Sequence, residues 1–345
     1  FISRFISFLF FFTIFYLIGR HYLKEENLVG QITTLGALLT SPIILFYSYN
    51  FLPDILALGL VLWGLFLFDK GLDKNIFKIL LILGLALFIK TSSGIYFIAV
   101  FAVFFLIHIR KPNKKLFVGL LVFLLIAVGV AYHDYVLINL KNKKLYSYVF
   151  LSGTRTVRNW AEFWEIFTTA RRFKMEYFTG IQWVVLLSIL GYSLTKIKRW
   201  NKDKNYQRLC VLVLIGLLAI IVMFGVQYKD HDYYVLGTFM PLILFTSFKV
   251  LKNIYSYIHP YTVTVLSCIF FVVSFTQGSN RYFNRMSETV WINVTMEHYE
   301  KDWLTNAHIK IKPYVQPDEY VYVVYVPEPN FALTYIERKG ATFNA

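Results

Sequence analysis

The recurrence of long apolar runs constrains this chain more than any other feature of its sequence. Ten runs of 14 to 20 residues lie at 5–19, 28–47, 52–68, 76–89, 94–109, 116–135, 181–195, 209–226, 233–248 and 261–277. A helix of about 20 mostly apolar residues crosses the hydrocarbon core of a bilayer, and flanking aromatic or basic residues extend shorter ones through the interface. We therefore expect an all-α polytopic membrane protein with about ten transmembrane helices.

Composition agrees with a membrane protein, and the loops indicate its orientation. Only 16% of the residues are charged, against roughly 25% in soluble domains, which argues against a water-soluble globule. The net charge of +15 does not indicate nucleic acid here, because the cations collect in alternate loops: four lie in 110–115 and six in 196–208. The short connections on the other side hold only Lys90 and Lys229. The positive-inside rule then places that side, with the long loop 136–180, outside the cytoplasm.

We expect two domains, a multi-span membrane domain at 1–278 and a small outer module at 279–345. The loop 136–180 of the membrane domain combines aromatic and basic residues, and the apolar spacing between Trp160 and Phe173 predicts a helix lying in the membrane interface. Its Arg155 and Arg158 are candidate phosphate contacts, although such cations commonly bind anionic lipids instead.

The outer module, after residue 278, is polar and predicts a mixture of helix and strand. A helix is expected at 303–311, a strand at 320–326 and a second strand at 331–336, after a turn rich in proline. The expected fold class is thus all-α in the membrane with a small α+β extracytoplasmic C-terminal module. So short a segment has little core of its own.

The sequence offers no metal or disulfide framework. Cys210 and Cys268 both lie inside apolar runs, where a free thiol behaves as a small buried hydrophobe. No zinc spacing is present, and a divalent cation as cofactor is left open.

Polar residues at the outer ends of the predicted spans are the first candidates for a site, because ionisable groups are costly inside a membrane. Asp54 starts the third span, Lys90 ends the fourth, and the loop between the eighth and ninth spans carries His231, Tyr233 and Tyr234. Each also has a structural interpretation. Asp54 fits an N-cap, Lys90 fits snorkelling to headgroups, the tyrosines fit an aromatic belt, and the histidine fits a solvated position.

A carboxylate, an ammonium and an imidazole on the same side as a basic, aromatic loop suit a phosphate-linked substrate whose lipid tail stays in the bilayer. Lysine neutralises phosphate charge, aromatic faces hold a sugar or an isoprenoid, and a carboxylate takes the proton of an acceptor. The triplet His133-Asp134-Tyr135 repeats the letters of His231-Asp232-Tyr233, but its pattern indicates no role.

Four segments together resemble a known family. They are SPIILFYSYNFLPD at 41–54, LALFIKTSSGIYF at 85–97, KDHDYYVLGTFMP at 229–241 and YVYVVYVPEPNFALTYIERKG at 320–340. In this order they resemble the polytopic, family 39-like glycosyltransferases related to protein O-mannosyltransferases and lipid A aminoarabinose transferases. The resemblance covers nearly the whole chain. It implies the C-type glycosyltransferase fold and sugar transfer from a polyprenyl-phosphate donor on the periplasmic or lumenal face.

The resemblance also assigns residues. It implies that Asp54 is the second acidic position of the family, that Lys90 is the lysine beside the donor phosphate, and that His231, Tyr233 and Tyr234 form the histidine-aromatic loop. The principal catalytic carboxylate of the family lies in the first outer loop, whereas this chain begins at what resembles the second span. We therefore expect that base upstream of Phe1.

The expected function is a membrane glycosyltransferase of the bacterial inner membrane, moving a sugar to a lipid, glycan or protein acceptor. Two alternatives use the same outward cations to gather a lipid phosphate. One is a lipid-phosphate flippase or transporter, for which paired repeats and broken helices are typical. The other is an O-antigen ligase or polymerase, also fed by polyprenyl carriers.

Overall fold

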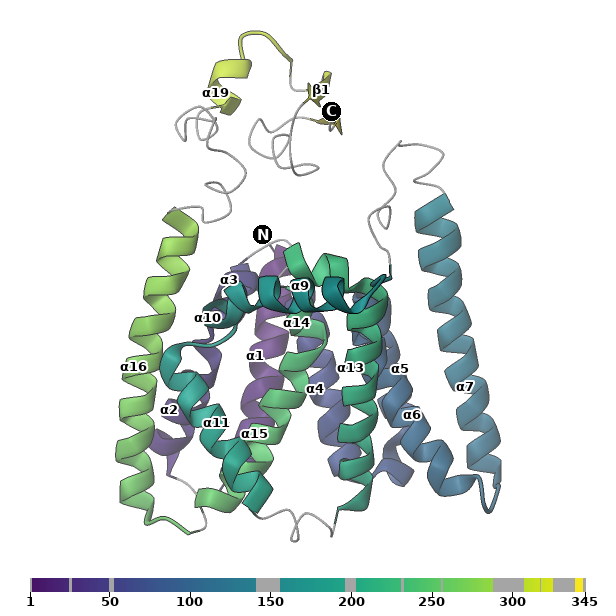
Figure 1. Cartoon of the computed structure of the whole chain (residues 1–345), viewed down its shortest axis with the longest axis vertical. Coiled ribbons are helices and arrows are strands. Elements are labelled where there is room, and N and C mark those ends of the chain that lie inside the picture. Colours follow the sequence, from purple (N-terminus) through teal and green to yellow (C-terminus); the bar gives the residue numbers. More distant parts are fainter. Residues whose placement is uncertain are drawn as a thin grey trace. The chain divides into compact units, whose positions relative to one another are not determined.

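The structure is a computed structural model that describes residues 2–24, 27–49, 53–140, 156–195, 203–230, 233–255, 257–287, 307–316, 318–324 and 339–343. It forms two compact units, Phe1–Arg281 and Tyr282–Ala345. The described residues of the first unit are mostly helical, and short turns and irregular segments join the helices (Figure 1). Its longer helices are α1 (Ile2–Tyr22), α2 (Leu28–Leu39), α3 (Pro42–Tyr49), α4 (Asp54–Asp69), α5 (Leu72–Ile89), α6 (Gly94–His108), α7 (Lys114–Ala131), α9 (Trp160–Ala170), α11 (Gly180–Thr195), α13 (Lys204–Asp230), α15 (Phe239–Tyr255) and α16 (Pro260–Ser287).

Short segments join several of these helices. A 3₁₀ turn η1 (Thr91–Ser93) separates α5 from α6, so the chain forms two helices there, as expected. A π-helix η2 (Tyr132–Leu140) continues α7, while η3 (Arg171–Phe173) and α10 (Lys174–Tyr177) follow α9. The four-residue α14 (Tyr234–Gly237) precedes α15.

All ten apolar runs are largely helical where the structure describes them, which confirms an all-α membrane protein at this level. By length and composition, five helical stretches of the described chain are able to cross a membrane: Phe5–Tyr22, Thr91–His108, Lys114–Val136, Lys204–Gly225 and Pro260–Asn284. The pair α2 and α3 adds a sixth if it is one bent span. Helices α4, α11 and α15 have only 16, 16 and 17 residues, and α5 carries Asp73, Lys74 and Lys78. The count of ten spans stays a prediction.

The first unit has large apolar side chains on its exposed surface as well as in its core. Leu58, Val61 and Leu65 of α4 are fully buried, and α4 packs against α1, α5 and α15. On α7, by contrast, Leu121, Leu125 and other large apolar side chains are exposed. A continuous exposed apolar helix is expected of a surface that faces lipid rather than water. These helices therefore indicate an integral membrane protein.

Helices α2 and α3 meet at a break where the chain bends by 80°. Pro42 is the first residue of α3 and has no N–H to continue the helix. The buried Gln182 of α11 donates from Nε2 to the Ala37 carbonyl at 2.6 Å, and the Ser41 hydroxyl donates to the Tyr177 carbonyl at 2.7 Å. Neighbouring helices therefore satisfy polar groups that the break leaves inside the bundle.

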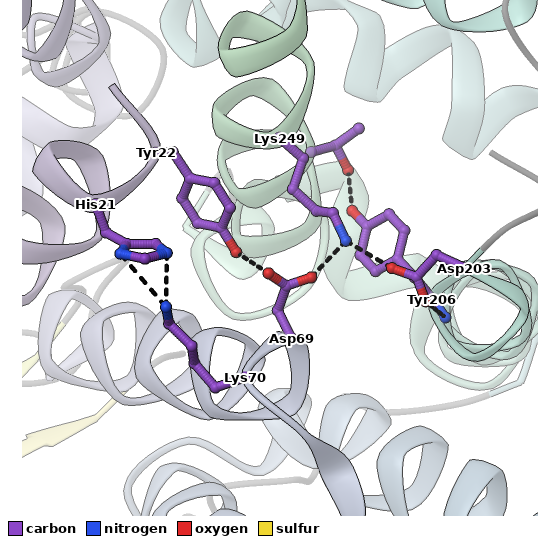
Figure 2. Close-up of polar contacts among 8 residues, drawn as sticks. His21, Tyr22, Asp69, Lys70, Asp203, Tyr206 and Lys249 are labelled. Atoms are coloured by element: carbon purple, nitrogen blue, oxygen red, sulfur yellow. Dashed lines mark hydrogen bonds and ion pairs between the residues drawn. The ribbon is translucent and has the colours of Figure 1, made fainter. Parts of the chain in front are cut away.

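A charged cluster joins four helices at the C-terminal end of α4 (Figure 2). The Lys249 ammonium of α15 lies 2.5 Å from Asp69 Oδ1 and 2.9 Å from Asp203 Oδ2, and 4.0 Å from the centre of the Tyr206 ring. The Tyr22 hydroxyl of α1 donates to the other Asp69 oxygen at 2.5 Å. A carboxylate at a helix C-terminus opposes the helix dipole, so Lys249 offsets an unfavourable charge. We call these five residues the Lys249 cluster.

Helix α9 runs across the ends of other helices rather than along them (Figure 1). The Asn159 side chain caps it by accepting from the Glu162 N–H at 2.9 Å. The Val157 N–H donates at 2.9 Å to the carbonyl of Val222, two residues before the non-helical Phe224 of α13. A helix starting at Trp160 is thus confirmed, and the residues before it are hydrogen-bonded to α13 beside a kink in that helix.

The second unit contains, among its described residues, helix α19 (Ala307–Ile311) and strands β1 (Tyr320–Val324) and β2 (Lys339–Phe343), which pair in parallel. Strand β1 agrees with the first expected strand. The second expected strand, at 331–336, and the start of the expected helix lie outside the described residues. A folded α+β module therefore stays a prediction.

Replacing Lys249 with methionine tests the Lys249 cluster. The change leaves the mostly buried Asp69 and the half-exposed Asp203 without their shared cation. We expect the unfolding free energy to fall by about 1 to 3 kcal/mol, less than for a fully buried pair. The measurement is the midpoint of thermal unfolding in detergent. Lys252→Met, at an exposed position of the same helix, is the control. Equal midpoints for the two variants would contradict a stabilising role.

Candidate functional site

Asp54 is the first residue of α4, and its side chain is completely buried. Pro53, not Asp54, is the N-cap residue of α4, and that cap has no side-chain hydrogen bond. The N-cap interpretation of Asp54 is therefore wrong. A carboxylate in the first turn is still favoured by the helix dipole, but its burial requires a counter-charge.

Lys90 supplies that counter-charge. Helix α5 ends at Ile89, and Lys90 adopts an extended backbone with φ −144° and ψ 105°, so the helix stops there and the chain turns into η1. The Lys90 ammonium lies 2.8 Å from Asp54 Oδ1, and the lysine side chain is only 15% exposed. Snorkelling to the headgroups does not describe this lysine, because its charge is paired inside the protein.

Two tyrosines cover the same ammonium. Lys90 Nζ lies 4.3 Å from the centre of the Tyr233 ring and 5.0 Å from that of Tyr234, distances typical of cation–π contacts. Tyr47 of α3 packs edge-on against Tyr233, with ring centres 5.9 Å apart. An aromatic belt would instead point such rings into the interface. We call Asp54, Lys90, Tyr233 and Tyr234 the Lys90 cluster.

Gly237 explains how α14 comes so close to the turn after Lys90. A Cβ at this glycine would lie 2.6 Å from Ser92 Oγ, 3.2 Å from Ser93 Oγ and 3.5 Å from Lys90 Cγ. Both serine hydroxyls are buried, and neither has a hydrogen-bond partner in the described part of the chain. Buried hydroxyls without partners are costly, so this contact places unused donors beside the Lys90 cluster.

Tyr96 of α6 holds the junction that follows α14. Its hydroxyl donates to the Thr238 carbonyl and accepts from the Leu242 N–H at 3.1 Å. Both Tyr96 and Thr238 are fully buried. Packing at Gly237 and hydrogen bonds at Thr238 therefore fix the segment that directly follows Tyr233 and Tyr234.

The arrangement suits an anionic group. Lys90 and Asp54 neutralise each other, so an incoming phosphate would compete with the carboxylate for the ammonium. The rings of Tyr233 and Tyr234 offer flat apolar surface beside this charge. In the described residues no group of three His, Cys, Asp or Glu side chains is placed to hold a metal ion.

The structure brings together four of the seven residues predicted for the site, namely Asp54, Lys90, Tyr233 and Tyr234. Arg158 is exposed just before α9, and no contact links it to the Lys90 cluster within the described chain. Arg155 and His231 lie outside the described residues.

Sequence reasoning missed several neighbours of this cluster. The serines at 92 and 93 belong to the KTSSG segment, whose pattern indicates only a turn, and Gly237 has no signal of its own. His133 and Asp134, to which the pattern assigns no role, lie next to the same turn: the Thr91 hydroxyl donates to Asp134 Oδ2 at 3.0 Å. The repeated HDY triplet is the one signal that points to them.

Gly237→Ala tests the close approach of α14. The added methyl group collides with Ser92 Oγ, and we expect the unfolding free energy to fall by about 1 to 3 kcal/mol. Thermal unfolding of the single variants and of Gly237→Ala combined with Ser92→Ala forms a double-mutant cycle. The combined variant should recover part of the loss. Gly129→Ala, where a Cβ meets nothing within 4 Å, serves as control; a Gly237→Ala protein as stable as this control would refute the contact.

We also compared the chain with known protein families, curated proteins and solved structures. No protein-family model, curated protein or solved structure matches the chain.

Proposed function

We propose that this protein is a membrane glycosyltransferase that moves a sugar from a polyprenyl-phosphate-linked donor to an acceptor on the non-cytoplasmic membrane face. The observation that carries the proposal is the Lys90 cluster, in which an ammonium pairs with buried Asp54 at 2.8 Å beneath two tyrosine rings. Three segments distant in sequence supply it, in the order and with the residue types that the family resemblance implies.

The chemistry of such a transfer matches the cluster. The acceptor oxygen bonds to the anomeric carbon while the bond from that carbon to the phosphate oxygen breaks, so negative charge grows on the departing phosphate. A fixed ammonium stabilises that charge. In this proposal Lys90 contacts the phosphate, the tyrosine rings pack against the sugar or isoprenoid, and Asp54 supports the site by holding the lysine. His231 and Arg155, together with Arg158, complete the substrate contacts.

The membrane setting belongs to the same proposal. Ten spans form a C-type glycosyltransferase fold whose loops follow the positive-inside rule, and the Lys90 cluster lies at the outer surface of a bacterial inner membrane. The lipid tail of the donor then stays in the bilayer while its phosphate reaches the protein. In the same proposal, the small C-terminal module belongs to the outer face.

A lipid-phosphate flippase or transporter is the second candidate, and one observation favours it. The 80° bend between α2 and α3 produces a broken helix of the kind that forms binding sites in transporters. The two candidates differ in outcome. A transferase makes a new glycosidic bond, whereas a transporter moves its lipid unchanged.

Lys90→Ala tests the transferase. Proteoliposomes containing the full-length protein receive a radiolabelled polyprenyl-phosphate sugar and acceptor lipids or peptides, and the labelled product is counted. We expect kcat to fall about 100-fold or more, as when a preorganised charge-stabilising group is removed, with normal membrane insertion. Lys78→Ala, at an exposed position of the same helix, should keep wild-type activity.

Two results would contradict this proposal. Full activity of Lys90→Ala would remove the lysine from the phosphate. Movement of the intact donor across the bilayer by the wild-type protein, without any labelled product, would identify the transporter instead.

A further inference from the structure

His133 and Asp134 form a hydrogen-bonded pair beside the turn that follows Lys90. His133 Nδ1 lies 3.0 Å from Asp134 Oδ1, and the second carboxylate oxygen accepts from the Thr91 hydroxyl at 3.0 Å. The side chains of His133 and Asp134 are 29% and 30% exposed, so the pair is anchored but open to a substrate. A carboxylate fixed at both oxygens holds the imidazole in one orientation.

The pair and the Lys90 cluster share one turn of chain. Thr91 directly follows Lys90, and the two side chains contact different partners: the lysine reaches Asp54, and the threonine reaches Asp134. The ring of Phe88, near the end of α5, lies 4.3 Å from the His133 imidazole. The ammonium of the cluster and the imidazole of the pair are therefore anchored through consecutive residues of one turn.

The backbone around the pair is unusual. Residues Tyr132–Leu140 form a π-helix directly after α7. Such helices are rare and occur frequently at functional sites. The pair is thus part of a backbone segment that departs from ordinary helical geometry beside the candidate site.

The hydrogen bonds define what the imidazole can do. With Nδ1 donating to Asp134, the tautomer leaves a lone pair on Nε2, and within the described part of the chain Nε2 has no partner. Asp134 is the only charged group found in contact with His133 there; Thr91 and Phe88, from the neighbouring turn and helix, are neutral. His133 is therefore arranged as a proton acceptor.

A second histidine–aspartate pair shows a different arrangement at the opposite ends of the same helices. His108 Nε2 lies 2.6 Å from Asp73 Oδ1, and its Nδ1 lies 3.2 Å from Asn113 Nδ2. Both ring nitrogens are engaged, so this imidazole has no free position for a proton from a substrate. The open nitrogen of His133 is not a general property of such pairs in this protein.

We propose that His133, oriented by Asp134, takes the proton of the acceptor hydroxyl during sugar transfer. The acceptor oxygen bonds to the anomeric carbon, its proton passes to His133 Nε2, and the bond to phosphate breaks with its electron pair on the polyprenyl phosphate. This inference rests on the proposed function. It assigns a role to the first HDY triplet, while the second triplet ends in Tyr233, whose ring covers Lys90.

Three variants of the full-length protein in proteoliposomes separate the steps. His133→Gln removes the base, and we expect kcat to fall about 100-fold. Asp134→Asn reverses the hydrogen bond and favours the tautomer with its proton on Nε2, so a loss of at least about tenfold is expected. Thr91→Val keeps the aspartate–histidine bond and should cost less than about fivefold. His108→Gln is the matched control and should keep wild-type kcat.

The pH profile distinguishes catalysis from folding. The wild-type rate should fall on acidification, because a protonated imidazole cannot take another proton, and this acid limb should disappear in His133→Gln. A His133→Gln protein with wild-type kcat and an unchanged acid limb would overturn the proposal for His133, while the transferase stands. A wild-type protein that forms no glycosidic product with any polyprenyl-phosphate sugar would overturn both the proposed transferase function and the role of His133.

Discussion

The complete burial of one carboxylate governs how this protein is assembled around α4. Asp54 has no exposed surface, and an unpaired charge there would cost several kcal/mol. The chain therefore has to bring a cation to the start of α4, which fixes where α5 ends and where Lys90 turns. The aromatic cover over that cation in turn requires α14 to lie against the η1 turn, and Gly237 makes this approach sterically feasible.

An aspartate–lysine ion pair occurs at each end of α4. At its first residue an aspartate pairs with Lys90, and at its last residue Asp69 pairs with Lys249. In both places the ammonium also lies over tyrosine rings. One segment, from Tyr233 through α14 and α15, contributes to both clusters. Tyr233 and Tyr234 belong to the Lys90 cluster, and Lys249 belongs to the Lys249 cluster. Helix α4 is thus tied to the same segment at both ends, which gives the candidate site a rigid support.

Sequence patterns predicted the helices well and the site in part. Apolar runs located the long helices of the membrane domain. The sequence placed Asp54 and Lys90 on the same side of the membrane but did not predict that they pair. Within the described residues, five helical stretches, or six with the bent pair, are long and apolar enough to cross a membrane, whereas the sequence pattern predicts ten spans. The contacts of Gly237, Ser92 and Asp134 depend on how distant helices approach each other, which local periodicity does not encode.

The two ends of α4 acquire their partners at different times during synthesis. Lys90 follows Asp54 by 36 residues, so their pair can close as soon as two neighbouring helices have been made. Asp69 and Lys249 are separated by 180 residues, a delay of roughly 9 to 36 s at about 5 to 20 residues per second. The Asp69–Lys249 pair therefore closes later in synthesis than the Asp54–Lys90 pair.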